Sequence, residues 1–147
     1  MRSLIFALGS IIFASSVLAA DAMQLDVTKP TIAAQQQLIL KTINGDPKYS
    51  ENSESDRVAV ISALQEVSEL LEGGKTVQSL DPQSKQKVDF NQGEVNRLLA
   101  KAYRESRMVC VNAAPIGSNM IKRVCKTAAA RTRESDFTRN NDTQVNQ

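Results

Sequence analysis

Two cysteines near the C-terminus restrict the fold of this 147-residue chain more than any other feature. Cys110 and Cys125 lie in the segment 106–127, on either side of Gly117 and Ser118. The residues around the cysteines, RMVCVN and MIKRVC, alternate between apolar and polar types, which is typical of strands. The segment therefore predicts an antiparallel β-hairpin closed by a Cys110–Cys125 disulfide.

The cysteine spacing also predicts a register for this hairpin. If the cysteines face each other, Gly117 and Ser118 form the tip, and a type II′ turn needs glycine at its first central position. Pro115 then lies opposite Met120, where its missing N–H leaves the ladder intact. The cysteines fall at a hydrogen-bonded pair, with Cα atoms about 5.5 Å apart. A bulge or a looser loop is the alternative, and we expect it to break this register.

The alternation divides the hairpin side chains between two faces. One face carries Val109, Val111, Met120 and Val124, together with Lys122 and Lys126. The other carries Met108, Cys110, Ile121, Arg123 and Cys125. An isolated hairpin is marginally stable in water, so we expect the valine face to pack on the rest of the protein.

The N-terminus has the pattern of a secretory signal peptide. Arg2 precedes the apolar run 4–13, and small residues follow at Val17, Ala19 and Ala20. Cleavage after Ala19 fits best, and cleavage after Ala20 is the alternative. An uncleaved membrane anchor is less favoured, because the run is shorter than the roughly 20 apolar residues of a span. We therefore expect residues 1–19 to be removed and the protein to be periplasmic or secreted, where disulfides persist.

Three segments have helical patterns. The first begins after Pro30, runs through 31–43 and is stopped by Gly45 to Pro47. The second has a capping Ser53 and ends at Gly73 and Gly74. Its apolar stripe consists of Val60, Leu64, Val67 and Leu71.

The third helix is the longest, from Pro82 to about Ser106, with Asp81 as its cap. It is either continuous through Gly93 or broken near 91–93. Its apolar stripe consists of Val88, Asn91, Val95, Leu98 and Ala102, with Leu99 beside it.

These patterns predict a mainly α protein. The fold is a small helical hairpin or bundle of about three helices, with a C-terminal disulfide-closed β-hairpin and a short final helix. The scarcity of aromatic residues, with no Trp, two Tyr and four Phe, suits packed helices. We expect a flexible leader at 20–29 and a single helical domain at 30–137. That domain includes the hairpin 107–126 and a final helix over 128–137, and a disordered tail follows at 138–147.

The chain contains no histidine, which excludes Ser-His-Asp and Cys-His sites and the common His-containing zinc sites. We expect no catalytic residue, no metal site and no cofactor. Glu94 paired with Glu105 or Asp89 is the remaining candidate for a carboxylate-based hydrolase. Glu94 and Glu105 are about three helical turns apart, roughly 16 Å, which is too far for two carboxylates acting on one bond.

Charge divides the chain into an acidic and a basic part. Residues 21–94 have seven Lys/Arg against twelve Asp/Glu, and residues 95–147 have ten against four. The basic hairpin either sits against the acidic helices or stays solvated, or it binds an anionic partner such as a lipid surface, a polysaccharide or an acidic protein. Nucleic acid is not favoured, because no stacking aromatics lie near the patch. The candidate binding residues are Arg104, Arg107, Lys122, Arg123 and Lys126, with Arg131 and Arg133 in the same patch.

Short motifs occur along most of the chain after residue 47: KYSE, FNQGEVNRLL, SRMVC, GS and VCKT. Together they resemble a group of small uncharacterised exported proteins of Gram-negative bacteria, with a helical body and a C-terminal two-cysteine segment. The resemblance implies the same compartment and build, and it carries no activity or ligand. Gly93 departs from the bulkier helix former expected there.

The function predicted from these features is that of a non-enzymatic exported binding or interaction protein of the periplasm or cell envelope. The basic hairpin is its expected contact surface. The alternative is a secreted inhibitor or effector that uses the hairpin as a rigid plug. The identity of the partner does not follow from the sequence.

Overall fold

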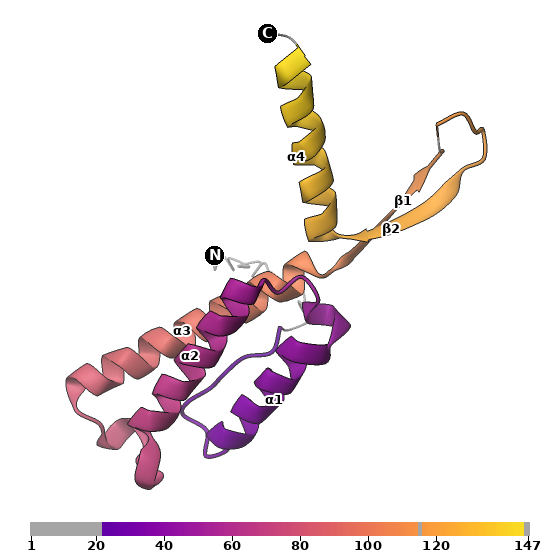
Figure 1. The fold of residues 1–147 in the computed structure, drawn as a ribbon. Helices are drawn as coiled ribbons and strands as arrows, with labels where there is room; N and C mark the ends of the chain where they lie inside the picture. The colour runs from indigo at the N-terminus through magenta and orange to yellow at the C-terminus, as the bar shows by residue number, and fades with distance from the viewer. Residues whose placement is uncertain (1–21, 115, 146–147) are drawn as a thin grey trace, which may run out of the picture.

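The computed structural model describes residues 22–114 and 116–145, so the predicted signal peptide and Pro115 lie outside the described residues. The protein is mainly helical, with a disulfide-closed hairpin and a final helix, as predicted (Figure 1). The helical body contains α1 (Ile32–Gly45), α2 (Glu54–Leu70) and α3 (Pro82–Glu105). The arm contains β1 (Met108–Ala113), β2 (Lys122–Thr127) and α4 (Ala128–Val145). Short 3₁₀ turns at Pro47–Tyr49, Glu72–Gly74 and Val77–Ser79 connect the body helices.

The predicted caps start the two long helices of the body. The Ser53 hydroxyl accepts the N–H of Asp56 at 3.1 Å at the start of α2. The Asp81 carboxylate accepts the N–H groups of Gln83 and Ser84 at the start of α3, where Pro82 is the first helical residue. The α3 helix continues through Gly93 without a break. Its buried side includes every residue of the predicted stripe.

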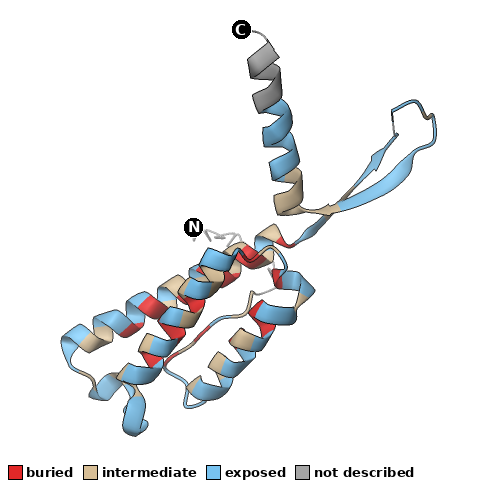
Figure 2. Ribbon diagram, in the orientation of Figure 1, coloured by how far each residue is buried: buried red, intermediate tan, exposed pale blue. Residues whose placement is uncertain are grey.

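The hydrophobic core lies entirely in the helical body (Figure 2). The α2 and α3 stripes face each other, and α1 packs on α2. Tyr49 closes one end of the core against Tyr103, with the ring centroids 5.8 Å apart. The buried apolar residues are Leu25, Val27, Ile39, Ile43, Tyr49, Val60, Ala63, Leu64, Val67, Val88, Val95, Leu98, Leu99 and Ala102.

The N-terminal segment 22–29 is part of this core, which corrects the predicted flexible leader at 20–29 for these residues, while residues 20 and 21 lie outside the described residues. Leu25 is 1% exposed and Val27 is 4% exposed. The segment runs in extended form between α1 and α3, and its backbone bonds to side-chain amides. The Leu25 N–H donates to Asn96 at 2.6 Å and the Val27 N–H donates to Gln92 at 3.0 Å. These partners are distant in sequence, so no local pattern indicated the docking.

The hairpin has the predicted register, with Cys110 opposite Cys125 and the two joined by a disulfide. The prediction that they form a hydrogen-bonded pair is wrong, because their Cα atoms are only 4.0 Å apart. In the same register the Ala128 N–H donates to the Arg107 carbonyl at 2.9 Å, and the alternation from there makes the cysteines a non-hydrogen-bonded pair.

The tip is wider than a two-residue turn. The ladder ends at the pair Ala113 and Lys122, and the described residues between them, 114 and 116–121, lie in a loop around Gly117, which has φ +80°. The longer loop allows the cysteines to be a non-hydrogen-bonded pair while Cys110 stays opposite Cys125. The expectation that a looser loop breaks the register is therefore wrong.

The valine face does not pack on the helices, contrary to the prediction. The hairpin leaves the end of α3 and points away from the body, so both of its faces are open (Figures 1 and 2). Ser106 ends α3 and the strands start at once, which carries them beyond the core. The final helix is also longer than predicted: α4 extends to Val145, so the predicted disordered tail is wrong for residues 138–145. No helix of the described residues is long and apolar enough to cross a bilayer.

Candidate functional site

The hairpin carries most of the exposed large apolar side chains that the structure describes. Ten such side chains are strongly exposed, and six of them lie between Met108 and Val124. The others are scattered singly over the body helices and α4, as is normal for a protein surface. A concentration of this kind on one projecting element indicates an interaction surface.

The apolar side chains are densest at the hairpin tip. Ile116 is fully exposed, Met120 is 69% exposed and Ile121 is 73% exposed. All three belong to the loop 114–121, where the Ser118 hydroxyl accepts the N–H of Met120 at 3.1 Å. We call Ile116, Met120 and Ile121 the apolar tip.

The predicted basic residues divide into three sets with different surroundings. Lys122 and Arg123 follow the apolar tip directly and have no ion pair among the described residues. Lys126 is paired with Glu134 of α4 at 2.7 Å. Arg104 and Arg107 lie away from the tip, at the junction of α3 and the arm. The sequence-based patch is therefore not one continuous surface, and its free charges nearest the tip are Lys122 and Arg123.

Arg104 and Arg107 line an open groove at the base of the arm. The groove has a volume of about 480 Å³ and is completed by Arg133 and Glu105, with Ala128 and Thr132 on the α4 side. Arg133 already pairs with Glu51 at 2.9 Å, and Glu105 adds a negative charge to the lining. Arg104 and Arg107 form no ion pair with another described residue, so the groove offers two guanidinium groups beside a mixed-charge rim.

Glu51 attaches the arm to the body. Its N–H donates to the Ser106 hydroxyl at 2.9 Å, and its carboxylate accepts hydrogen bonds from Thr127 and Arg133. The Arg133 bond, followed by the Thr127 bond, lowers the pKa of Glu51 below its ordinary value. Thr127 also caps α4 by accepting the N–H of Ala130 at 3.1 Å. One carboxylate therefore fixes the base of the hairpin and the start of α4.

Glu94 and Glu105, which the sequence offered as a pair for acid–base work, are separated by about three turns of the continuous α3 helix, roughly 16 Å. Glu94 accepts two hydrogen bonds from Arg97, at 2.8 and 2.6 Å, and these lower its pKa. Lys101 likewise lowers the pKa of Asp56, at 2.7 Å. A general acid near neutral pH needs a raised pKa, so these two carboxylates are suited to ion pairing instead.

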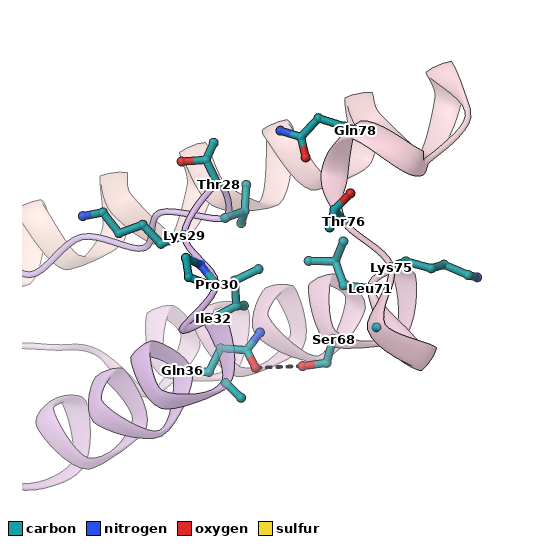
Figure 3. A pocket seen from close by; sticks show the side chains of 13 residues that line it. Thr28, Lys29, Pro30, Ile32, Gln36, Ser68, Leu71, Lys75, Thr76 and Gln78 are labelled. Carbon is teal, nitrogen blue, oxygen red and sulfur yellow. Dashed lines mark hydrogen bonds between the residues drawn. The ribbon is translucent and has the colours of Figure 1, made fainter.

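A second groove lies at the end of the body remote from the arm (Figure 3). It has a volume of about 560 Å³, between the N-terminal segment, α1 and the end of α2. Ile32 and Leu71 contribute apolar walls, and a Ser68 to Gln36 hydrogen bond of 2.8 Å crosses its floor. The described residues that line it include Lys29 and Lys75 but no carboxylate.

Sequence reasoning missed the apolar tip and Glu51. The signal for the apolar tip was Ile116, an apolar residue next to the turn glycine Gly117. Turn positions usually carry polar residues, so an isoleucine there is unusual. Glu51 had no such signal, since its partners are 55 to 82 residues away. Comparison with known proteins adds no partner or activity to this surface: the chain matches no family model, no curated protein and no solved structure.

Proposed function

We propose that the protein is exported and acts as a non-enzymatic binding protein of the cell envelope, with the hairpin as its contact surface. The observation that carries this proposal is the projecting hairpin, whose outer part presents exposed apolar and basic side chains beyond the contacts that α4 makes with its base. An isolated two-stranded hairpin is only marginally stable in water, and a concentration of exposed apolar side chains is typical of an interaction site. The disulfide in the stem suits an oxidising compartment, as does the signal-like segment 1–19.

Affinity capture from a Gram-negative envelope extract tests the binding role. The variant carries Lys122→Gln, Arg123→Gln and Lys126→Gln, and we expect it to lose most of the material that the natural chain captures. The matched control carries Lys41→Gln, Lys48→Gln and Lys87→Gln, three exposed lysines of the body, and has the same net charge. Equal capture by both variants would contradict the proposed contact surface.

The intact mass of the protein recovered from the periplasm or medium tests the export half of the proposal. We expect a mass that lacks residues 1–19 and two hydrogens, the latter lost in the disulfide. A full-length mass in the cytoplasmic fraction, or two free thiols, would contradict export.

The same projecting tip also favours a second candidate, a plug that enters the cleft of another protein. Deleting residues 113–120 and assaying co-secreted hydrolases separates the two candidates. Release of hydrolase inhibition by the deletion would support the plug.

A further inference from the structure

We infer that the hairpin tip inserts into the surface of an anionic phospholipid bilayer, an inference that rests on the proposed binding role and names its partner. The apolar tip is Ile116, Met120 and Ile121, at the far end of the stem. Interfacial helices that combine apolar with basic side chains bind at the boundary of headgroups and acyl chains, with the apolar side chains about 5–10 Å deep. The order of residue types along the hairpin follows that arrangement.

The positions of the nearest charges fit the depth of the headgroup layer. A strand rises about 3.3 Å per residue, so Lys122 and Arg123 lie roughly 3 and 7 Å behind Ile121. The polar layer of one leaflet is about 5–8 Å thick. Successive strand residues point to opposite faces, so these two cations stand on both sides of the ribbon. They form a collar at the depth where the lipid phosphates lie.

The rest of the hairpin keeps the acidic body away from such a surface. The six-residue strands form a stem about 20 Å long, which is more than twice the Debye length of about 8 Å at physiological salt. The net charge of −5 over residues 21–94 is therefore screened when the tip is in contact. The basic end faces the lipid and the acidic end faces solvent, which orients the molecule.

The loop backbone limits the depth of insertion. Residues 114–121 lie beyond the ladder, and unsatisfied N–H and C=O groups are costly in hydrocarbon. A shallow position at the interface leaves these groups in contact with headgroups and water. The structure thus favours an interfacial anchor.

The groove shown in Figure 3 is a poor site for the tip of a second copy. A protein partner would need an apolar hollow with an acidic rim to accept both the tip and its collar. That groove, of about 560 Å³, is lined by Lys29 and Lys75 and by no carboxylate among the described residues. Its charge has the wrong sign for Lys122 and Arg123.

Co-sedimentation with lipid vesicles tests the inference on the purified, oxidised protein. We expect binding to vesicles of phosphatidylcholine mixed with phosphatidylglycerol, and much weaker binding to phosphatidylcholine alone. Changing Ile116→Ser and Ile121→Ser should weaken binding roughly tenfold or more, because apolar area is no longer buried. Changing Lys122→Gln and Arg123→Gln should weaken it by roughly fivefold per charge.

Two controls separate insertion from general stickiness. Phe90 is 72% exposed on α3, so Phe90→Ser removes a similar apolar side chain away from the tip and should leave binding unchanged. Lys41 is exposed on α1, far from the hairpin in the fold, so Lys41→Gln removes one surface cation away from the collar and should have less than about a twofold effect. If Phe90→Ser weakens vesicle binding as much as the two isoleucine changes do, the inference is overturned. It is also overturned if the lysine control weakens binding as much as Lys122→Gln and Arg123→Gln.

The absence of tryptophan from the chain supplies a direct reporter of depth. A single Ile116→Trp substitution should show a blue-shifted emission with anionic vesicles and no shift with soluble polyphosphate. A shift with polyphosphate alone, or none with vesicles, overturns the lipid assignment. If vesicle binding fails while hairpin-dependent capture from a delipidated envelope extract persists, the binding role survives and the lipid inference is lost. If capture is independent of the hairpin, the proposed function fails as well.

Discussion

Glu51 holds the two parts of the molecule together with contacts of different chemistry. Its main chain bonds to Ser106 at the end of α3, and its carboxylate bonds to Thr127 and Arg133 in the arm. The carboxylate is only 16% exposed, whereas the Arg133 side chain is 66% exposed. The arm is therefore attached through a partly screened ion pair and a more protected hydroxyl bond.

Protonation of Glu51 should loosen the arm. The folded pKa is lowered by Arg133 and Thr127, so the stabilisation is fully present above the unfolded value of about 4.3 and is lost as the pH falls through the folded pKa. Glu51→Gln should raise amide exchange several-fold at the start of α4, and the protection of these amides, corrected for the intrinsic pH dependence of exchange, should no longer change across that acidic range. Hydrogen exchange with mass readout measures both effects.

Glu54→Gln is the matched control for this prediction, because Glu54 is 79% exposed and pairs only with Arg57 of its own helix. It should leave exchange in the arm unchanged. If both variants loosen α4 equally, net charge is responsible and the Glu51 contacts are not.

At the scale of the elements, the backbone requires glycine in the hairpin loop but not in the long helix α3. Gly93 lies in the interior of α3 on the exposed side, and no atom lies within 4 Å of the place where a Cβ would stand. Gly117 has φ +80°, a left-handed conformation that residues with a side chain rarely adopt. Alanine therefore fits the helix and strains the loop.

Gly93→Ala should raise the free energy of unfolding by about 0.5–1 kcal/mol, because alanine loses less backbone entropy in a helix. Gly117→Ala should leave unfolding of the body unchanged and increase amide exchange in the hairpin loop. Urea denaturation followed by circular dichroism measures the first effect and hydrogen exchange the second. A destabilised body in Gly93→Ala would mean that α3 needs its glycine for a contact that the structure does not contain.

The elements that could be predicted from sequence are those fixed by neighbouring residues. Ser53 and Asp81 cap helices whose stripes recur every turn, and the cysteine spacing sets the register regardless of how the tip is built. The N-terminal segment could not be predicted, because Leu25 and Val27 are held by amides 65 to 71 residues away. The open valine face could not be predicted either, since it depends on where α3 ends relative to the core.

At the scale of the whole molecule, the core and the disulfide belong to different parts. Every buried apolar residue of the described chain lies between Leu25 and Ala102, and both cysteines lie in the arm. A disulfide stabilises the unit whose unfolded chain it constrains, by roughly 3 kcal/mol for a loop of this size. The bond should therefore act on the hairpin and not on the helical body.

Reduction of the disulfide should leave the thermal midpoint of the body within about 2 °C, while amide exchange in β1 and β2 increases. Circular dichroism melts with and without dithiothreitol measure the first quantity, and hydrogen exchange the second. The double variant Cys110→Ser and Cys125→Ser serves as the control for side effects of the reductant. A large shift of the body midpoint in that variant would show that the arm and the core unfold as one unit.

The docked N-terminal segment lies in the body in the way that a bound peptide lies in a groove. Side-chain amides of Asn96, Gln92 and Gln35 bind the backbone of residues 25–27, while Leu25 and Val27 fill apolar sites between the helices. This is how a receptor groove holds an extended peptide, with main-chain bonds for affinity and alternate side chains for selectivity. The body thus holds its own N-terminal segment as such a groove holds a peptide, and covalent attachment keeps that segment at an effective concentration in the millimolar range.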